Sequence, residues 1–251
     1  MVHLPALPGS PASVHPVDEI VERAVGDARA LAEAGFDAVM IENFGDAPFT
    51  AETIPPASLA AMAVAARAVR QAISLPIGIN ALRNDARAAL GIAVASGASF
   101  IRVNVHAGVA ATDQGVITGR ARETLDYRKL LGARVAIFAD VHVKHATPIS
   151  EPNLARAAKD TAYRGLADAL IVSGPATGVA VATCDLDVVR EAVPDRRVFV
   201  GSGATAENVT ALLDRATGII VGSGLKIGGD PARPIDMDLA RQFVLAAKHR
   251  R

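Results

Sequence analysis

Short apolar segments rich in Val and Ile alternate along the chain with longer Ala-rich segments in which apolar residues recur at helical spacing. The short segments are almost continuously hydrophobic, as expected for parallel strands that are buried on both faces. They predict eight strands, at residues 1–4, 37–41, 76–80, 100–105, 134–141, 168–173, 198–201 and 218–222. The longer segments predict eight helices, at residues 17–34, 57–73, 85–96, 120–131, 153–164, 185–193, 204–213 and 235–248.

Strict alternation of strands and helices predicts a parallel α/β sheet with helical crossovers. Eight repeats favour a closed (β/α)8 TIM barrel over an open, doubly wound sheet. The length of 251 residues fits one such barrel. Gly35, Gly97 and Gly165 directly follow predicted helices, where glycine commonly ends a helix. We therefore expect residues 1–251 to form a single TIM-barrel domain.

Composition and charge narrow the function classes. The chain has 26 Lys and Arg against 26 Asp and Glu, no Trp and two Tyr, which argues against a nucleic-acid binder. The mean hydropathy is +0.29. However, long uncharged stretches such as 169–184 are interrupted, here by Gly174 and Gly178, so we expect no integral membrane association. The single Cys184 excludes an internal disulfide. With no secretory leader visible, we expect a cytoplasmic protein.

Polar residues collect at the predicted carboxyl ends of the strands, where TIM barrels place their active sites. These candidates are His3, Glu42, Asn80, Arg102, Asn104, Asp140, His142, Lys144 and Ser173. Alternation along a strand places Arg102, Asn104 and His106 on one face of strand 4. It places Asp140, His142 and Lys144 on one face of strand 5. The alternative is an internal salt bridge of Arg102 with Asp140 or Glu42, because buried charges need partners.

Two Gly-Ser-Gly turns predict phosphate-binding loops after strands 7 and 8. The turn Gly201, Ser202 and Gly203 directly precedes a predicted helix, and Gly222 and Ser223 open the second turn. Glycine lets backbone N–H groups approach an anion, and helix amino termini favour negative charge. A dinucleotide-binding turn and ordinary tight turns are the alternatives.

Two long connections are rich in small residues, as mobile lids are. One follows strand 4 and contains Asp113, Gln114 and Gly115. The other follows strand 6 and contains Gly174 and Gly178. Either could instead be ordinary surface.

Several sequence blocks together resemble the BtpA/SgcQ family over essentially the whole chain. The blocks are residues 1–11, 42–49, 82–85, 100–104, 112–115 and 139–146. The resemblance implies a TIM barrel of the ribulose-phosphate-binding type and a homo-oligomer. The founding family member is linked to photosystem I biogenesis, whereas other members occur in non-photosynthetic bacteria, so the family does not fix a reaction.

The first hypothesis is an isomerase, epimerase or aldolase (lyase) acting on a phosphorylated sugar or similar small metabolite. Glu42, Asp140 and His142 would act as general acids or bases, and Lys144 as an electrostatic catalyst or Schiff-base nucleophile. A non-catalytic assembly factor and a nucleotide hydrolase are the alternatives. The sequence identifies no cofactor, although a divalent metal could be held by mixed nitrogen and oxygen ligands. The candidate ligands are His3, Glu42, Asp140 and His142.

Overall fold

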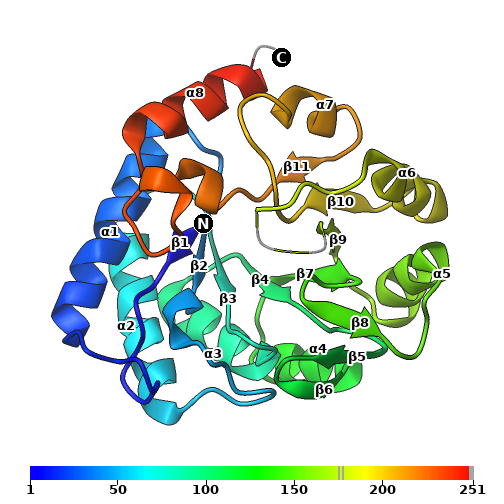
Figure 1. The fold of residues 1–251 in the computed structure, drawn as a ribbon. Coiled ribbons are helices and arrows are strands. Elements are labelled where there is room, and N and C mark those ends of the chain that lie inside the picture. The colour runs from blue at the N-terminus through cyan, green and yellow to red at the C-terminus, as the bar shows by residue number, and fades with distance from the viewer. Residues whose placement is uncertain (175, 177, 249–251) are drawn as a thin grey trace.

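A computed structural model describes residues 1–174, 176 and 178–248. Eight parallel strands form one sheet and curl into the ring seen in Figure 1, in the order β1-β2-β3-β4-β7-β9-β10-β11. They are β1 (Val2–His3), β2 (Val39–Glu42), β3 (Ile77–Asn80), β4 (Phe100–Val103), β7 (Ala136–Val141), β9 (Ala169–Val172), β10 (Arg197–Val200) and β11 (Gly218–Ile219). All eight predicted strands are present, and the predicted parallel TIM-barrel architecture is confirmed.

The two edges of the sheet meet without a ladder between β1 and β11 in the described part of the chain. The Met1 nitrogen donates to the Val221 carbonyl at 2.8 Å. A Cβ atom on Gly222 would lie 3.0 Å from the His3 ring. Both contacts bring the carboxyl end of β11 against β1.

Helices surround the ring on the outside (Figure 1). They are α1 (Val17–Ala34), α2 (Pro56–Ala72), α3 (Ala86–Ser96), α4 (Ala121–Leu130), α5 (Leu154–Lys159), α6 (Thr183–Ala192), α7 (Val209–Leu213) and α8 (Met237–Lys248). Gly35 and Gly97 end their helices in the left-handed conformation, as predicted. Gly165 does not: it has φ −77° and follows a π-helical turn, η2 (Asp160–Arg164). A Cβ there would lie 2.8 Å from the Thr161 carbonyl, so close packing explains this glycine.

Two layers of side chains fill the barrel. Phe100, Phe138 and Phe199 stack with ring centroids 4.9 Å apart across its lower part. Alternation places Arg102 and Asp140 directly above Phe100 and Phe138, toward the carboxyl ends of the strands. The barrel therefore has an apolar floor beneath a charged layer.

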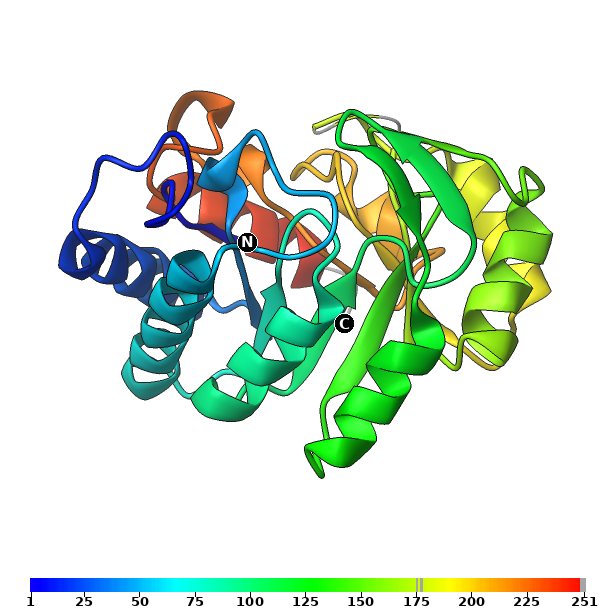
Figure 2. The same cartoon turned by 90° about the horizontal axis from the view of Figure 1, so that it is seen from below.

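A small antiparallel sheet was not predicted from the sequence. It comprises β5 (Val109–Thr112), β6 (Gly115–Thr118) and β8 (Ala146–Pro148), in the order β6-β5-β8. The predicted loop after strand 4 is thus a hairpin, and it stands above the carboxyl ends of the barrel strands (Figure 2). It buries Ala110 and Ile117 in a cluster with Val105 and Val143. That burial depends on distant residues, which explains why local patterning did not reveal the hairpin.

The predicted helix 204–213 is also wrong at its start, because α7 begins only at Val209. The Asn208 side chain accepts from the Thr205 N–H at 2.8 Å and donates to the Gly203 carbonyl at 2.9 Å. These bonds hold residues 203–208 as turns. Among the described residues, no helix has the length and apolarity needed to cross a membrane. The single-domain organisation stays a prediction.

Candidate active site

A cavity of about 240 Å³ opens at the carboxyl ends of β2, β4 and β7. Its lining includes Glu42, Arg83, Arg102, Asn104, Asp113 and Lys144. We call it the mouth cavity. The structure therefore brings together candidates predicted from four separate segments, and it adds Arg83, whose sequence signal was only its place after strand 3.

Arg102 and Asp140 form a buried, two-pronged ion pair at the base of the mouth. Arg102 donates to the Asp140 carboxylate from Nε at 2.9 Å and from Nη2 at 2.7 Å. The Asn104 amide and the Ser173 hydroxyl donate to the same carboxylate, at 3.0 and 3.4 Å. Burial alone would lower the pKa of Arg102, but Asp140 outweighs it and raises that pKa. The internal salt bridge considered as an alternative is therefore present for this pair.

Glu42 lies at the end of β2 and is 5% exposed. Its carboxylate accepts a hydrogen bond from the Asn80 amide at 2.5 Å, and His3 Nε2 lies 3.8 Å away. Burial would raise the pKa of Glu42, but His3, Lys144 and Arg102 outweigh it, so the pKa falls below its usual value. Burial also lowers the pKa of His3, to about 4. At neutral pH the mouth thus holds an ionised Glu42 beside an uncharged imidazole.

Lys144 reaches the mouth cavity from the segment after β7. Within the described residues, its ammonium group makes no ion pair shorter than 4.0 Å. Burial lowers the pKa of Lys144; Glu42 opposes this effect, whereas Arg102 and Arg83 add to it. Arg83 is held in place by donating from Nη2 to the Lys144 carbonyl at 2.7 Å. Lys144 is therefore a half-buried amine that pairs with no carboxylate among the described residues, so its charge is available to a ligand.

Two buried polar atoms of the mouth lining, Arg83 Nε and Asn104 Oδ1, have no hydrogen-bond partner among the described residues. Neither does Oδ1 of Asn80, whose amide nitrogen bonds to Glu42. Buried polar atoms are almost always hydrogen-bonded in native proteins. The donor and the acceptor in the cavity lining, and the acceptor of Asn80 beside Glu42, are therefore positions where a polar ligand or water would bind.

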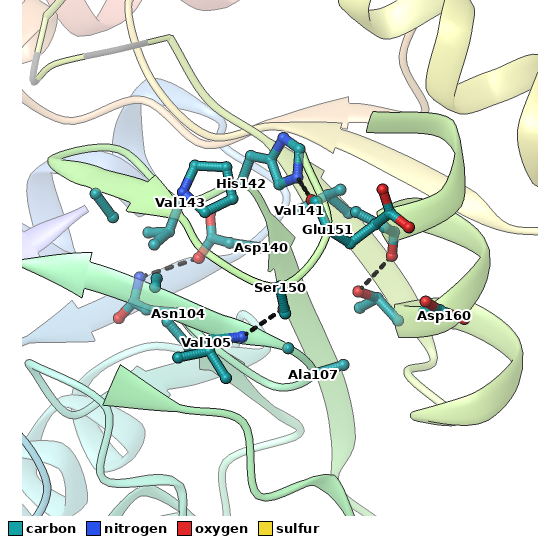
Figure 3. Close-up of a pocket in the computed structure, with 17 residues that line it drawn as sticks. Asn104, Val105, Ala107, Asp140, Val141, His142, Val143, Ser150, Glu151 and Asp160 are labelled. Carbon is teal, nitrogen blue, oxygen red and sulfur yellow. Dashed lines mark hydrogen bonds between the residues drawn. The ribbon is translucent and has the colours of Figure 1, made fainter. Parts of the chain in front are cut away.

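A second cavity of about 290 Å³ lies on the other side of Asn104, between the small sheet and α5 (Figure 3). Asn104 and Asp140 form one wall, and Glu151 and Asp160 lie on the opposite side. The small sheet contributes Val109, Ala110, Ala146 and Pro148. We call this space the roofed cavity.

His142 lines the roofed cavity and is absent from the lining of the mouth cavity. Strand β7 ends at Val141, and His142 has φ +52°, so the predicted alternation of Asp140, His142 and Lys144 on one face is wrong. The His142 ring instead donates from Nε2 to the Glu151 carbonyl at 2.8 Å.

The turn at Gly201–Gly203 packs beneath the segment that follows β9. Ser202 Oγ accepts from the Gly174 N–H at 3.1 Å and donates to the Val179 carbonyl at 3.4 Å. A Cβ atom on Gly203 would lie 2.3 Å from that carbonyl oxygen. The helix expected directly after this turn is absent, since α7 begins at Val209, so a helix amino terminus does not support phosphate binding here.

The second turn and the predicted lids also have definite positions. Gly222 lies against His3, and a short 3₁₀ helix, η3, spans Ser223–Leu225. A Cβ on Gly178 would lie 3.7 Å from Ser223 Oγ. Asp113 and Gln114 form the tip of the β5–β6 hairpin, and Gly115 begins β6 with φ +103°. Lid motion and phosphate binding stay predictions.

The four proposed metal ligands do not converge. Among the described residues, no group of three or more His, Cys, Asp or Glu side chains is arranged to hold a metal ion. Asp140 is taken up by Arg102 and Asn104, and His142 turns toward Glu151. The metal alternative is therefore withdrawn for these residues.

Solved structures of other proteins share the fold. Phosphoribosyl anthranilate isomerase from Thermus thermophilus superposes with a TM-score of 0.59 at 15% identity, covering 90% of this chain and 95% of that enzyme. At this identity the likeness shows a TIM-barrel-type fold alone.

Sequence relatives identify the family. A Photosystem I biogenesis protein BtpA from Synechocystis is 46% identical over 246 residues, covering 98% of this chain and 86% of that protein. An uncharacterized protein from Pyrococcus furiosus is 46% identical over 244 residues, covering 97% and 92%. The model of the BtpA family matches residues 1–249. The chain therefore belongs to the BtpA family.

Proposed function

We propose that this protein is an enzyme that moves a proton at a carbon next to a carbonyl group of a small phosphorylated metabolite. The observation that carries the proposal is the contrast inside the mouth. Arg102 and Asp140 neutralise each other, whereas Glu42 and Lys144 face the mouth cavity without forming an ion pair with each other. A carboxylate and an amine placed around one cavity suit isomerase, epimerase and aldolase or lyase chemistry alike.

Glu42 is the proposed base. Its carboxylate is ionised at neutral pH and is held by Asn80, so it can accept a proton from a substrate carbon. Lys144 would stabilise the negative charge that develops on the carbonyl oxygen. The alternative role of Lys144 is as a Schiff-base nucleophile, because burial lowers its pKa and so favours the neutral amine that attacks a carbonyl carbon.

Asp140 has a positioning role in this scheme, because four donors already occupy its carboxylate. The free carbonyl oxygens of Asn80 and Asn104 would accept hydrogen bonds from substrate hydroxyl groups. His142, in the roofed cavity, would not act on the same carbon as Glu42.

The substrate phosphate has two proposed positions. Arg83 and Lys144 supply positive charge at the mouth cavity itself. The turns at Gly201–Gly203 and Gly222–Gly224 occupy the positions that bind phosphate in many TIM barrels. In this structure the first turn is covered by Val179 and Ala180, which would have to move aside for an anion.

Deuterium exchange tests the reaction class whatever the product is. The protein is incubated in D₂O with a panel of aldose and ketose phosphates, and loss of the C–H signal beside the carbonyl is followed by proton NMR. We expect exchange in at least one compound, reduced about 100-fold or more in Glu42→Gln and in Lys144→Met. Lys129→Met, at an exposed position on α4, is the control. Absence of exchange across the panel would overturn the proposal.

A non-catalytic assembly role is the second candidate, favoured by the likeness to the Synechocystis photosystem I biogenesis protein. The double variant Asp140→Ala with Lys144→Ala separates the two. Normal folding with full biological activity would favour assembly over catalysis. Nucleotide hydrolysis is a weaker alternative, tested by phosphate release from ATP and GTP.

We also propose a homo-oligomer, as the family resemblance implies, and a cytoplasmic location, as the single cysteine and the lack of a visible secretory leader suggest. Native mass spectrometry of the full chain measures the oligomeric state directly, and a strictly monomeric spectrum would contradict that part of the proposal.

A further inference from the structure

The two cavities have Asn104 in common in their linings but differ in charge. The mouth cavity is lined by Arg83, Arg102 and Lys144, whereas none of the described residues lining the roofed cavity is Lys or Arg. The roofed cavity is instead lined by three carboxylates. Asp140 is neutralised by the buried Arg102, whereas Glu151 and Asp160 pair, within the described part of the chain, only with the exposed Arg156 and Arg164, at 3.6 and 3.8 Å. A phosphate would find no cation in this lining, whereas the carboxylates of Glu151 and Asp160 can accept further hydrogen bonds from N–H donors.

The rest of the roofed cavity is apolar. Val109 and Ala110 come from β5, Pro148 comes from β8, and Val105 and Val143 continue the wall below the small sheet. A sugar, whose hydroxyl groups surround its ring, would leave many of them unpaired against such walls. A flat ring with a few N–H groups at its edge would bury its faces and direct those groups to the carboxylates.

Two further observations connect the roofed cavity with the proposed site. Asn104, which is 3% exposed, lines both cavities and has an unpartnered Oδ1. Strand β5 of the hairpin lines the roofed cavity, and Asp113, at the tip of the same hairpin, lines the mouth cavity. Asp160 and Thr161 belong to the π-helical turn η2, an irregularity found frequently at functional sites.

We propose that the substrate has two parts: an anionic end held in the mouth cavity and an amino-substituted ring held in the roofed cavity, joined past Asn104. This substrate class, a phosphorylated compound bearing an amine-substituted heterocycle, rests on the proposed function. It goes beyond that function because it assigns the roofed cavity a ligand of its own.

Isothermal titration of the full chain with four probes tests the assignment. AMP carries phosphate and an amino-substituted ring, IMP replaces the amino group by a carbonyl, ribose 5-phosphate lacks the ring, and adenosine lacks the phosphate. We expect AMP to bind at least about tenfold tighter than IMP or ribose 5-phosphate, because only AMP donates from an exocyclic amino group to a carboxylate.

Two variants locate that preference. Ala157→Leu fills the roofed cavity from α5, and we expect it to lower AMP affinity to that of ribose 5-phosphate, whose own affinity stays within about twofold. Ala155→Leu, on the same helix but outside the lining of the cavity, should bind AMP as the wild type does. Glu151→Gln avoids a change of volume and should reduce the preference for AMP over IMP.

The outcomes separate this inference from the proposed function. Binding of ribose 5-phosphate with no preference for AMP, or an Ala157→Leu variant that binds AMP normally, would overturn the two-part substrate and leave the proposed function standing. Adenosine binding that is lost in Ala157→Leu, without binding of any phosphorylated probe, would support the ring site and count against a phosphorylated substrate. No binding of all four probes would overturn the assignment.

Discussion

Two lysines near the top of the barrel, Lys226 buried and Lys144 half-buried, have opposite surroundings. Lys226 is 1% exposed, forms an ion pair with Asp27 of α1, and lies in the segment that joins β11 to α8. Lys144 lines the mouth cavity and has no such partner in the described part of the chain. Burial lowers the pKa of both amines.

The difference indicates what each lysine does. Asp27 also accepts from the Ile235 N–H at 2.8 Å, so the pair ties α1 to the loop before α8. A charge that is fully satisfied in this way holds structure together. An unsatisfied charge beside a cavity costs stability, and proteins retain such charges mainly where function requires them.

The largest effect on stability is expected at Lys226. Lys226→Met leaves Asp27 buried without its cation, and we expect a loss of about 3–5 kcal/mol in the free energy of unfolding, measured by urea denaturation. The double variant Lys226→Met with Asp27→Leu removes both charges and should regain much of that loss. A cost below about 1 kcal/mol for the single variant would contradict the structural role.

His3 provides a smaller effect and a test of burial at the mouth. Burial lowers its pKa from 6.5 to about 4, so between these values the unfolded chain binds a proton that the folded chain does not. Stability therefore falls as the pH drops through this window, by about 3 kcal/mol for this group. Between pH 6.5 and pH 4, the free energy of unfolding of the wild type should therefore fall by about 3 kcal/mol more than that of His3→Gln.

Urea denaturation at several pH values measures the difference. His15→Gln is the matched control, because the His15 side chain is 33% exposed and pairs with Glu19 at the surface. Parallel stability curves for the wild type and His3→Gln would show that His3 is not buried beside Glu42 as described.

The sequence predicted the parts of the site that lie on regular strands. Arg102, Asn104 and Asp140 converge because two-residue alternation fixes which side chains enter the barrel. The prediction failed one residue beyond β7, where His142 leaves the extended conformation. The sequence also did not predict that the loop after strand 4 forms a hairpin, or that Arg83 lines the mouth cavity. Their positions depend on packing between distant segments, and a local pattern does not encode such packing.

The smallest expected effect distinguishes Lys144 from Lys226 most directly. Lys144→Met removes a half-buried amine that makes no ion pair with the described residues. We therefore expect the free energy of unfolding to change by about 1 kcal/mol or less, and to increase. The folded pKa of Lys144 lies below its ordinary value of 10.5, so the unfolded chain binds more protons between these two values. Wild-type stability should therefore contain a rise with pH through this window, and Lys144→Met should lack it.

Lys129→Met, at an exposed position, should keep the wild-type slope in urea denaturation between about pH 8 and pH 10. If Lys144→Met instead cost several kcal/mol, as Lys226→Met is expected to, Lys144 would have a structural role, and the case for it as a catalytic amine would fail.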